Sequence, residues 1–253
     1  MAFVRYEPQD AAGHVVLITM DRGDKLNAFN LEMIDEMEAT WRKLEADPRA
    51  RVAVLTGSGR AFAVGLDMKE MAEGKMGPSI LQTTAPNRFS PRIQTKPVVA
   101  AINGPALGAG LDFVAMECDI LVASESATFG MPEVIVGMAS LGSPFAWANV
   151  PRAVAMELFL TGEPISARRA YETGFVNRVV AADQVLKTAL ELAQRIAQNA
   201  PNAVRQSRKN LLDATQASEA SRVGETLAPH RAEMKDSAAR GVESFVKKQR
   251  PTW

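Results

Sequence analysis

Short aliphatic runs alternate with stretches of helical periodicity over the first 182 of the 253 residues in this chain. The runs at Val15–Met20, 52–56, Val98–Ile102 and 120–123 are rich in β-branched residues, which predicts strands, and 127–130 is a further short candidate. A sequence that alternates strands with helices packs them as layers around one core. The alternation therefore predicts an α/β domain.

The clearest helical stretch follows Asn30, a residue type that caps helix N-termini. Apolar residues then recur at helical spacing as far as Asp47-Pro48, where the helix is expected to end. They are Leu31, Ile34, Met37, Trp41 and Leu44. This pattern predicts an amphipathic helix with one face against the core.

Beyond about residue 182 the chain is predicted to be helical. Asp183 is a candidate N-cap for a helix that reaches about residue 199. Its expected apolar stripe consists of Leu186, Leu190, Ala193 and Ile196 or Ala197. Further helices are expected at about 203–214 and 225–248. We therefore predict a core of residues 1–195 and a helical C-terminal subdomain of residues 196–253 that serves oligomerisation.

The charge balance and the cysteine content limit which partners and which cellular compartment we expect. Lys and Arg number 29 and so do Asp and Glu, so the chain offers no general electrostatic footprint for nucleic acid or an anionic membrane. The single cysteine, Cys118, allows no intrachain disulfide and fits a reducing compartment. Residues 1–10 lack the apolar region of a signal peptide, and no apolar run is long enough to span a membrane. We expect a cytoplasmic protein with no nucleic-acid or membrane partner.

Two glycine-containing segments could present backbone N–H groups to a ligand. Gly65 allows a conformation that leaves the next N–H pointing into a cleft, although an ordinary turn also explains it. The segment 103–110 is small and glycine-rich and opens a predicted helix. The first N–H groups of a helix are unpaired and stabilise negative charge, while tight packing of helix on sheet is the alternative explanation.

Two acidic residues lie in apolar sequence. Asp112 falls in the first turn of that predicted helix, and Glu133 follows Met131-Pro132 and precedes an apolar run. Acids in such settings are costly unless they are paired or functional. For Asp112, attraction of an acid to the helix N-terminus is the alternative explanation.

The chain lacks the residues that several other kinds of functional site require. The chain has no G-x-S-x-G motif, only His14 and His230 could act as imidazole bases, and no His, Cys, Asp and Glu cluster has metal-ligand spacing. Gly57-Ser58-Gly59 follows a strand-like run, but Phe62 stands where a dinucleotide fingerprint needs glycine. We expect neither a metal site nor a nicotinamide site.

Five sequence blocks follow one another in a fixed order. They are LNAF at 26–29, VLTG through Asp67 at 54–67, KPVVAAING at 96–104, CDI at 118–120 with FGMPE at 129–133, and LTG at 160–162 with GFVN at 174–177. Over about residues 12–250 the chain thereby resembles the enoyl-CoA hydratase/isomerase, or crotonase, superfamily. The resemblance implies a spiral of ββα repeats with a helical C-terminal subdomain, assembled as a homotrimer or a dimer of trimers.

The resemblance also implies the parts of an active site. The N–H groups of Leu66 and Ala109 would form an oxyanion hole, although Ala109 stands where glycine is usual. Glu133 matches an acid of the family in type, whereas Asp112 replaces the usual glutamate and is one methylene shorter. Isomerases of the family often rely on a single acid, commonly at the position of Glu133.

Contacts with the coenzyme A part of an acyl-CoA substrate are implied at eight positions. They are Lys25, Ala63, Gly65, Asp67, Met68, Lys69, Gly108 and Lys248. For each lysine, a solvated surface charge is the alternative explanation. Because coenzyme A belongs to the substrate, no separate cofactor is expected.

The resemblance predicts a lyase that reversibly adds water to a trans-2-enoyl-CoA through an enolate. A Δ3-Δ2-enoyl-CoA isomerase or another acyl-CoA dehydratase is the alternative within the same chemistry. A non-catalytic RNA-binding or scaffold protein is a remote alternative, and both the lack of a basic face and the presence of Glu133 argue against it.

Overall fold

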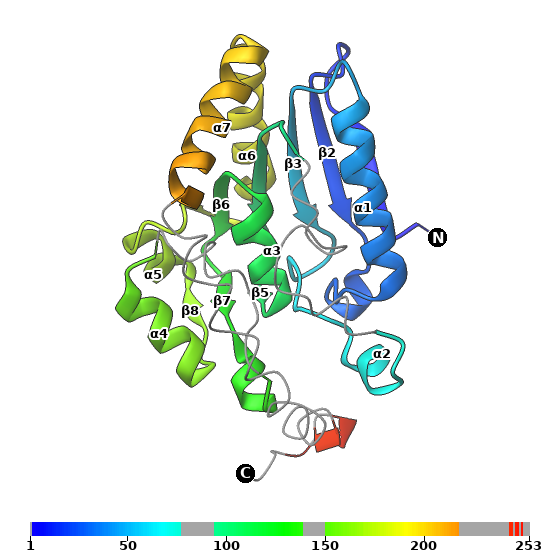
Figure 1. Ribbon diagram of the computed structural model, residues 1–253, viewed down its shortest axis with the longest axis vertical. Coiled ribbons are helices and arrows are strands. Elements are labelled where there is room, and N and C mark those ends of the chain that lie inside the picture. Colours follow the sequence, from blue (N-terminus) through cyan, green and yellow to red (C-terminus); the bar gives the residue numbers. More distant parts are fainter. Residues whose placement is uncertain are drawn as a thin grey trace.

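In the computed structural model, a six-stranded sheet forms the centre of the molecule (Figure 1). The structure describes residues 2–76, 94–138 and 150–217, together with 243–244, 246–247 and 249. β1 is antiparallel to β2, and the other neighbouring strands are parallel. In spatial order the strands are β1 (Val4–Pro8), β2 (Val15–Met20), β3 (Val52–Gly57), β4 (Val98–Ile102), β6 (Ile120–Ser124) and β9 (Arg178–Val180).

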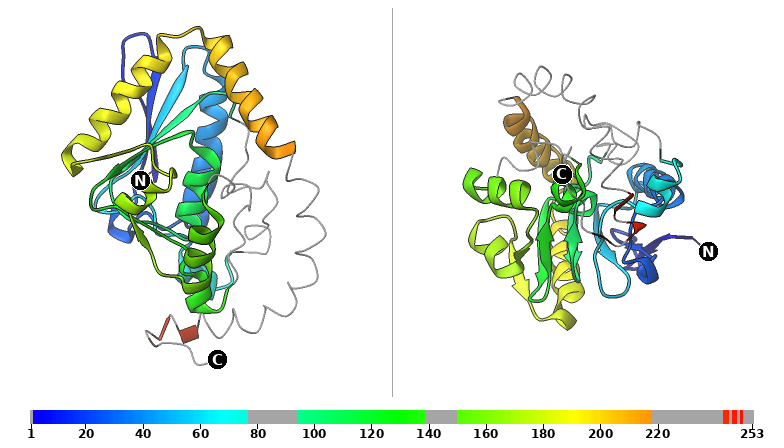
Figure 2. Two further views of the ribbon diagram at one scale, coloured as in Figure 1. Left: turned by 90° about the vertical axis from the view of Figure 1, so that its left-hand side faces the viewer. Right: turned by 90° about the horizontal axis from the view of Figure 1, so that it is seen from below.

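Helices cover both faces of this sheet (Figures 1 and 2). Alternate residues of a strand point to opposite faces of the sheet. On one face, Val52 and Val54 of β3 pack with α6 (Val185–Ala197). On the other face, Ala53 and Leu55 pack in the core that includes α1 (Leu31–Ala46) and α3 (Ala109–Glu117). A sheet buried on both sides needs apolar residues at consecutive positions, as the fully buried β3 and β4 show.

α1 forms as its sequence predicts. The Asn30 side chain accepts a hydrogen bond from the N–H of Met33 over 3.0 Å and so caps the helix. Four residues of the predicted stripe are buried, namely Ile34, Met37, Trp41 and Leu44. The fifth, Leu31, is half-buried.

A second sheet carries the segments that build the site. It consists of β5 (Ala106–Leu107), β7 (Thr128–Gly130) and β8 (Ile165–Ser166), with β7 in the middle. The remaining helices are α2 (Met68–Ala72), α4 (Arg152–Thr161), α5 (Ala167–Glu172) and α7 (Pro201–Ala217), and 3-10 turns cover Gly23–Lys25, Pro132–Val136 and Ala182–Gln184. No helix within the described ranges combines the length and apolarity needed to cross a membrane.

The start of α6 differs from its prediction. Asp183 lies inside the 3-10 turn, and Gln184 occupies the N-cap position without a capping side-chain bond. The buried stripe is Val185, Ala189, Ala193 and Ala197, whereas Leu186 is 38% exposed. Small side chains let the helix backbone approach the valine-covered sheet closely, so size outweighs hydrophobicity at these positions.

Other sequence predictions differ from the structure or extend beyond the described residues. Strand β1 was not predicted, because its half-exposed residues at the sheet edge lack a clear alternation. The predicted helix at 203–214 is α7, which is longer at both ends. The boundary predicted after residue 195 falls inside α6. Most of the helix predicted at 225–248 lies outside the described residues.

Candidate active site

Two chain segments that follow neighbouring parallel strands lie against each other at the carboxyl end of the sheet. We call residues 61–67, after β3, the β3 arm, and residues 104–110, after β4, the β4 arm. The N–H of Leu107 donates to the carbonyl of Ala63 over 2.9 Å, and Phe62 and Ala63 donate to Pro105. A Cβ on Gly110 would lie only 2.3 Å from the carbonyl oxygen of Ala63, so only glycine permits this approach.

The amides of Leu66 and Ala109 lie in adjoining parts of the two arms. Gly65 has φ +98°, and a Cβ on it would lie 3.5 Å from the Ala109 nitrogen. Phe29 bonds to the carbonyl of Gly65 and to the N–H of Asp67, each over 2.8 Å. Successive N–H groups of an extended segment point to opposite sides, so the Leu66 N–H points away from Phe29. Within the described residues, neither the Leu66 nor the Ala109 N–H donates a hydrogen bond.

The carboxyl group of Glu133 reaches the β4 arm from the 3-10 turn Pro132–Val136. A Cβ on Gly108 would lie 2.7 Å from Glu133 Oε1. Glu133 Oε2 is buried and has no hydrogen-bond partner within the described part of the chain. Loss of solvent around the carboxyl group raises the pKa of Glu133 to about 7. A carboxyl group with that pKa can both take up and release a proton near neutral pH.

Asp112 occupies the first turn of α3, three residues after Ala109. It is 7% exposed, and its N–H donates to the carbonyl of Gly108 over 3.0 Å. The two predicted amides and the Glu133 carboxyl group therefore lie beside Gly65 and Gly108, and Asp112 lies one turn away along α3. Such a set can hold a carbonyl oxygen that gains negative charge while a carboxyl group moves a proton at a neighbouring carbon.

The predicted coenzyme A contacts lie at different depths. Ala63 is fully buried, and Asp67 caps α2, which starts at Met68. Lys25 is exposed, and the Lys69 side chain is 84% exposed, with Nζ 3.9 Å from Glu73 Oε1. Gly65 and Gly108 line the junction of the arms as described above. Lys248 lies outside the described residues. All eight contacts stay predictions.

Two residues that support the site were missed at the sequence level. Asn27 is fully buried with φ +54°, and its Nδ2 donates to the carbonyls of Ser58 and Ala61, each over 2.9 Å. The Arg22 side chain is 11% exposed and lies 2.8 Å from Asp67. The sequence Asp21-Arg22-Gly23-Asp24 has the composition of a turn after a strand, where an arginine is ordinarily solvated. A cation next to a turn glycine gives no signal of burial in the sequence.

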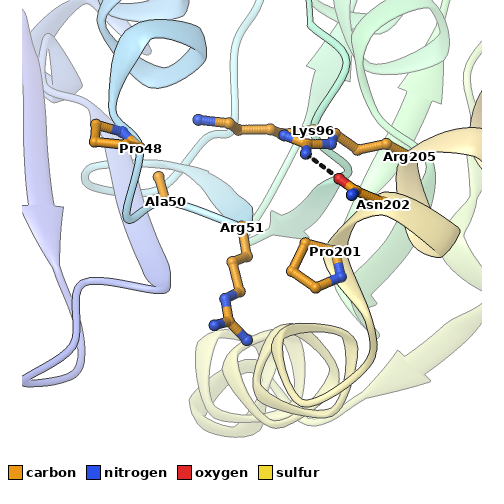
Figure 3. A pocket seen from close by; sticks show the side chains of 7 residues that line it. All are labelled: Pro48, Ala50, Arg51, Lys96, Pro201, Asn202 and Arg205. Carbon is orange, nitrogen blue, oxygen red and sulfur yellow. Dashed lines mark hydrogen bonds between the residues drawn. The ribbon is translucent and has the colours of Figure 1, made fainter.

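The pocket shown in Figure 3 lies at the opposite end of the sheet, where Arg51 precedes β3 and Lys96 precedes β4. It encloses about 290 Å³. Lys96 Nζ donates to the carbonyls of Leu44 and Asp47, each over 2.6 Å, and to that of Glu45 over 3.2 Å. Arg51 donates to the carbonyl of Ala197 over 2.8 Å. These cations hold the C-terminal carbonyls of α1 and α6, which explains their presence without a ligand.

Comparison with known proteins identifies the family. Residues 10–253 match the family model of the enoyl-CoA hydratase/isomerase family. A mevalonyl-coenzyme A hydratase of Aspergillus fumigatus is 35% identical over 252 residues, which cover 95% of this chain and 91% of that protein. A 2,3-dehydroadipyl-CoA hydratase of Escherichia coli is 36% identical over 205 residues, 78% of each chain.

Solved structures give the same result for the fold. A carnitinyl-CoA hydratase from Mycobacterium avium superposes with a TM-score of 0.83 at 32% identity, covering 100% of this chain and 98% of that one. A monofunctional enoyl-CoA isomerase from Mycobacterium smegmatis gives 0.71 at 26% identity, covering 86% of this chain and 96% of that one. The predicted crotonase-like α/β fold is therefore confirmed, and the chain is an enzyme of the enoyl-CoA hydratase/isomerase family.

Proposed function

We propose that this enzyme reversibly adds water to the double bond of a trans-2-enoyl-CoA thioester. The observation that carries the proposal is the carboxyl group of Glu133 in contact with Gly108, beside two amides that donate to nothing else in the described chain. Relatives named as hydratases of several acyl-CoA thioesters support the same reaction type.

The thioester oxygen would lie between the N–H groups of Leu66 and Ala109. Conjugate addition places negative charge on that oxygen, and each aimed donor contributes about 3 kcal/mol to stabilising it. In hydration, Asp112 would accept a proton from water as the oxygen adds to the β-carbon, and Glu133 would deliver its proton to the α-carbon. The reverse reaction needs Glu133 ionised to take the α-proton and Asp112 protonated to return a proton to the departing water, and both acids then return to their starting states by exchange with solvent.

A Δ3-Δ2-enoyl-CoA isomerase is the second candidate. A single buried carboxyl group with a pKa near 7, that of Glu133, suffices to move a proton from one carbon to another. Water activation by Asp112 is not needed in that reaction. The two reactions therefore differ in what they require of Asp112.

We further propose a homotrimer or a dimer of trimers in the cytoplasm, acting on acyl-CoA without a separate cofactor. Exposed apolar side chains on two helices support an assembly: Leu160 on α4 is 69% exposed, and Leu211 on α7 is 70% exposed. Light scattering coupled to size exclusion tests the assembly, and a monomer at micromolar concentration would contradict it.

The decisive experiment follows the loss of the enoyl-thioester absorbance band over a panel of trans-2-enoyl-CoA substrates. We expect wild-type turnover on at least one chain length, and a fall of about 10³-fold in kcat for Glu133→Gln, which should still fold with a cooperative melting transition. Full activity of the folded Glu133→Gln variant would disprove the assigned role. Product analysis by mass, which increases on hydration and is unchanged on isomerisation, separates the two candidates.

A further inference from the structure

The Arg22 side chain, which is 11% exposed, begins a hydrogen-bond chain that ends at Leu66. Arg22 Nη1 donates to the carbonyl of Ala28 over 2.8 Å, and Nη2 lies 2.8 Å from Asp67 Oδ2. The backbone N–H of Arg22 donates to Asn27 Oδ1 over 2.9 Å. Because Nη1 and Nη2 each have a partner and the backbone of Arg22 is also bonded, the direction of the guanidinium group is fixed.

The chain continues through two peptide units. The Ala28 carbonyl belongs to the same peptide unit as the Phe29 N–H, which donates to the carbonyl of Gly65 over 2.8 Å. The Gly65 carbonyl belongs in turn to the same peptide unit as the Leu66 N–H. Arg22, the two peptide units and the Leu66 N–H thus follow one another donor to acceptor, and all their dipoles point the same way.

We propose that Arg22 positions and polarises the Leu66 amide, an inference that rests on the proposed function. When a peptide carbonyl accepts a hydrogen bond, the N–H of the same peptide unit becomes a stronger hydrogen-bond donor, and the effect passes along a chain of hydrogen bonds. A charged donor gives the stronger bond at the head of the chain. The benefit increases as the thioester oxygen gains charge, so it lowers the barrier more than it tightens substrate binding.

Asp67 holds the peptide units that follow those of the chain, after Phe29 and after Leu66. Its Oδ1 accepts the N–H groups of Lys69 over 3.0 Å and Glu70 over 3.3 Å, while its own N–H donates to the carbonyl of Phe29 over 2.8 Å. Asp67 therefore fixes the residue next to Leu66 and keeps the Arg22 guanidinium in place. Its role in this chain is positional.

Arg208 provides a matched control for a purely structural role. Its side chain is 15% exposed, pairs with Asp119 at 2.8 Å and donates to the carbonyl of Gln94 over 2.7 Å. Asp119 precedes β6, so these contacts lie at the end of the sheet opposite the two arms. Arg208→Gln thus removes an ion pair and a carbonyl contact of the same kind as Arg22→Gln, but away from the chain to Leu66.

The test measures the carbonyl stretch of an acyl-CoA thioester labelled with ¹³C at the carbonyl, free and bound, together with kcat, KM and melting temperature. Binding to the wild type should lower the stretching frequency. For Arg22→Gln we expect part of that shift to be lost and kcat to fall about ten-fold, with KM changing less than about two-fold. Arg22→Lys should recover part of both, and Arg208→Gln should keep the wild-type shift and kcat.

A wild-type shift in folded Arg22→Gln would overturn the inference, as would an equal loss of shift in Arg208→Gln. If Arg22→Gln does not fold, Arg22→Lys decides, because a lysine ammonium lacks the two-pronged geometry and an unchanged shift then contradicts the role of Arg22. A wild type that binds the labelled thioester without any shift would overturn the proposed oxyanion site itself, and a shift altered only in the Arg22 variants supports both.

Discussion

The two arms reach the same place by different physical means. In the β4 arm, Ala109 is the first residue of α3, and the Gly108 carbonyl accepts from Leu111 over 2.9 Å and Asp112 over 3.0 Å. The helix itself thus polarises the Ala109 N–H. In the β3 arm, Leu66 lies in an extended segment, and its amide depends on Phe29 and on the distant Arg22. Secondary structure orients one donor, and tertiary contacts orient the other.

Among changes within the two arms, the largest effect should follow from removing the donor of the β4 arm. Proline has no N–H yet is well accepted at the first position of a helix, which Ala109 occupies. We expect Ala109→Pro to lower kcat by about 10²- to 10³-fold, the usual cost of one oxyanion donor. Ala109→Ser keeps the N–H and should stay within about three-fold of the wild type. Similar kcat values in the two folded variants would show that the β4 arm supplies no donor.

Asp112, on α3 just beyond the β4 arm, tests a contribution to catalysis other than the Ala109 amide. We expect Asp112→Asn to lower the hydration rate by about 10²-fold, because the amide cannot accept a proton from water. An isomerase assay on a 3-enoyl-CoA should lose less than about ten-fold. Equal losses in the two assays would remove water activation as the role of Asp112.

Glu133 contacts the β4 arm at Gly108, so its titration reports on that side of the site. Its pKa rises from an ordinary 4.5 to about 7 on folding. The associated stability is present below pH 4.5 and is lost as the pH rises to about 7, which amounts to about 3 kcal/mol. Glu133→Gln should therefore melt several degrees above the wild type at pH 8 and close to it at pH 4. A constant difference between the two melting curves would contradict this burial.

The same titration should appear in the rates. Hydration starts with one proton on Glu133, and dehydration starts with that one proton on Asp112, so both directions use the singly protonated pair. Since the reaction releases no net proton, its equilibrium constant does not depend on pH, and kcat/KM should fall above about pH 7 in both directions alike. A value of kcat/KM that stays constant as the pH rises through about 7 would assign the proton transfer to another group.

The smallest effect is expected in the β3 arm at Asp67. Asparagine caps helices as well as aspartate does, so Asp67→Asn should keep α2 and lose only the charge opposite Arg22. We expect kcat to fall about three-fold, less than for Arg22→Gln, with a small change in melting temperature. A larger loss than for Arg22→Gln would place the control of the β3 arm in Asp67.

Local patterns predicted much of this molecule. The strands at β2, β3, β4 and β6 and the cap of α1 follow from residue type and period, because these elements face a core on one or both sides. The ordered blocks identified Leu66, Ala109 and Glu133, which the fold brings to one place. The buried face of α6 was predicted wrongly at Leu186, because the fit of small side chains to the sheet cannot be read from hydrophobicity alone.

The supporting contacts could not be predicted for a related reason. Whether Arg22 lies in solvent or under the β3 arm depends on where Ala28 and Asp67 lie after folding. The same holds for Gly110, whose need for glycine arises from a carbonyl 47 positions earlier in the chain, that of Ala63. Such residues are set by close approaches between distant segments.

Both donors belong to the peptide backbone, which leaves the side chains of Leu66 and Ala109 free to differ. Evolution can therefore reshape the walls beside the reacting carbonyl, admitting a longer, branched or acidic acyl group, without redesigning how that carbonyl is activated. A scaffold of this kind can diversify in what it accepts while its chemistry stays constant.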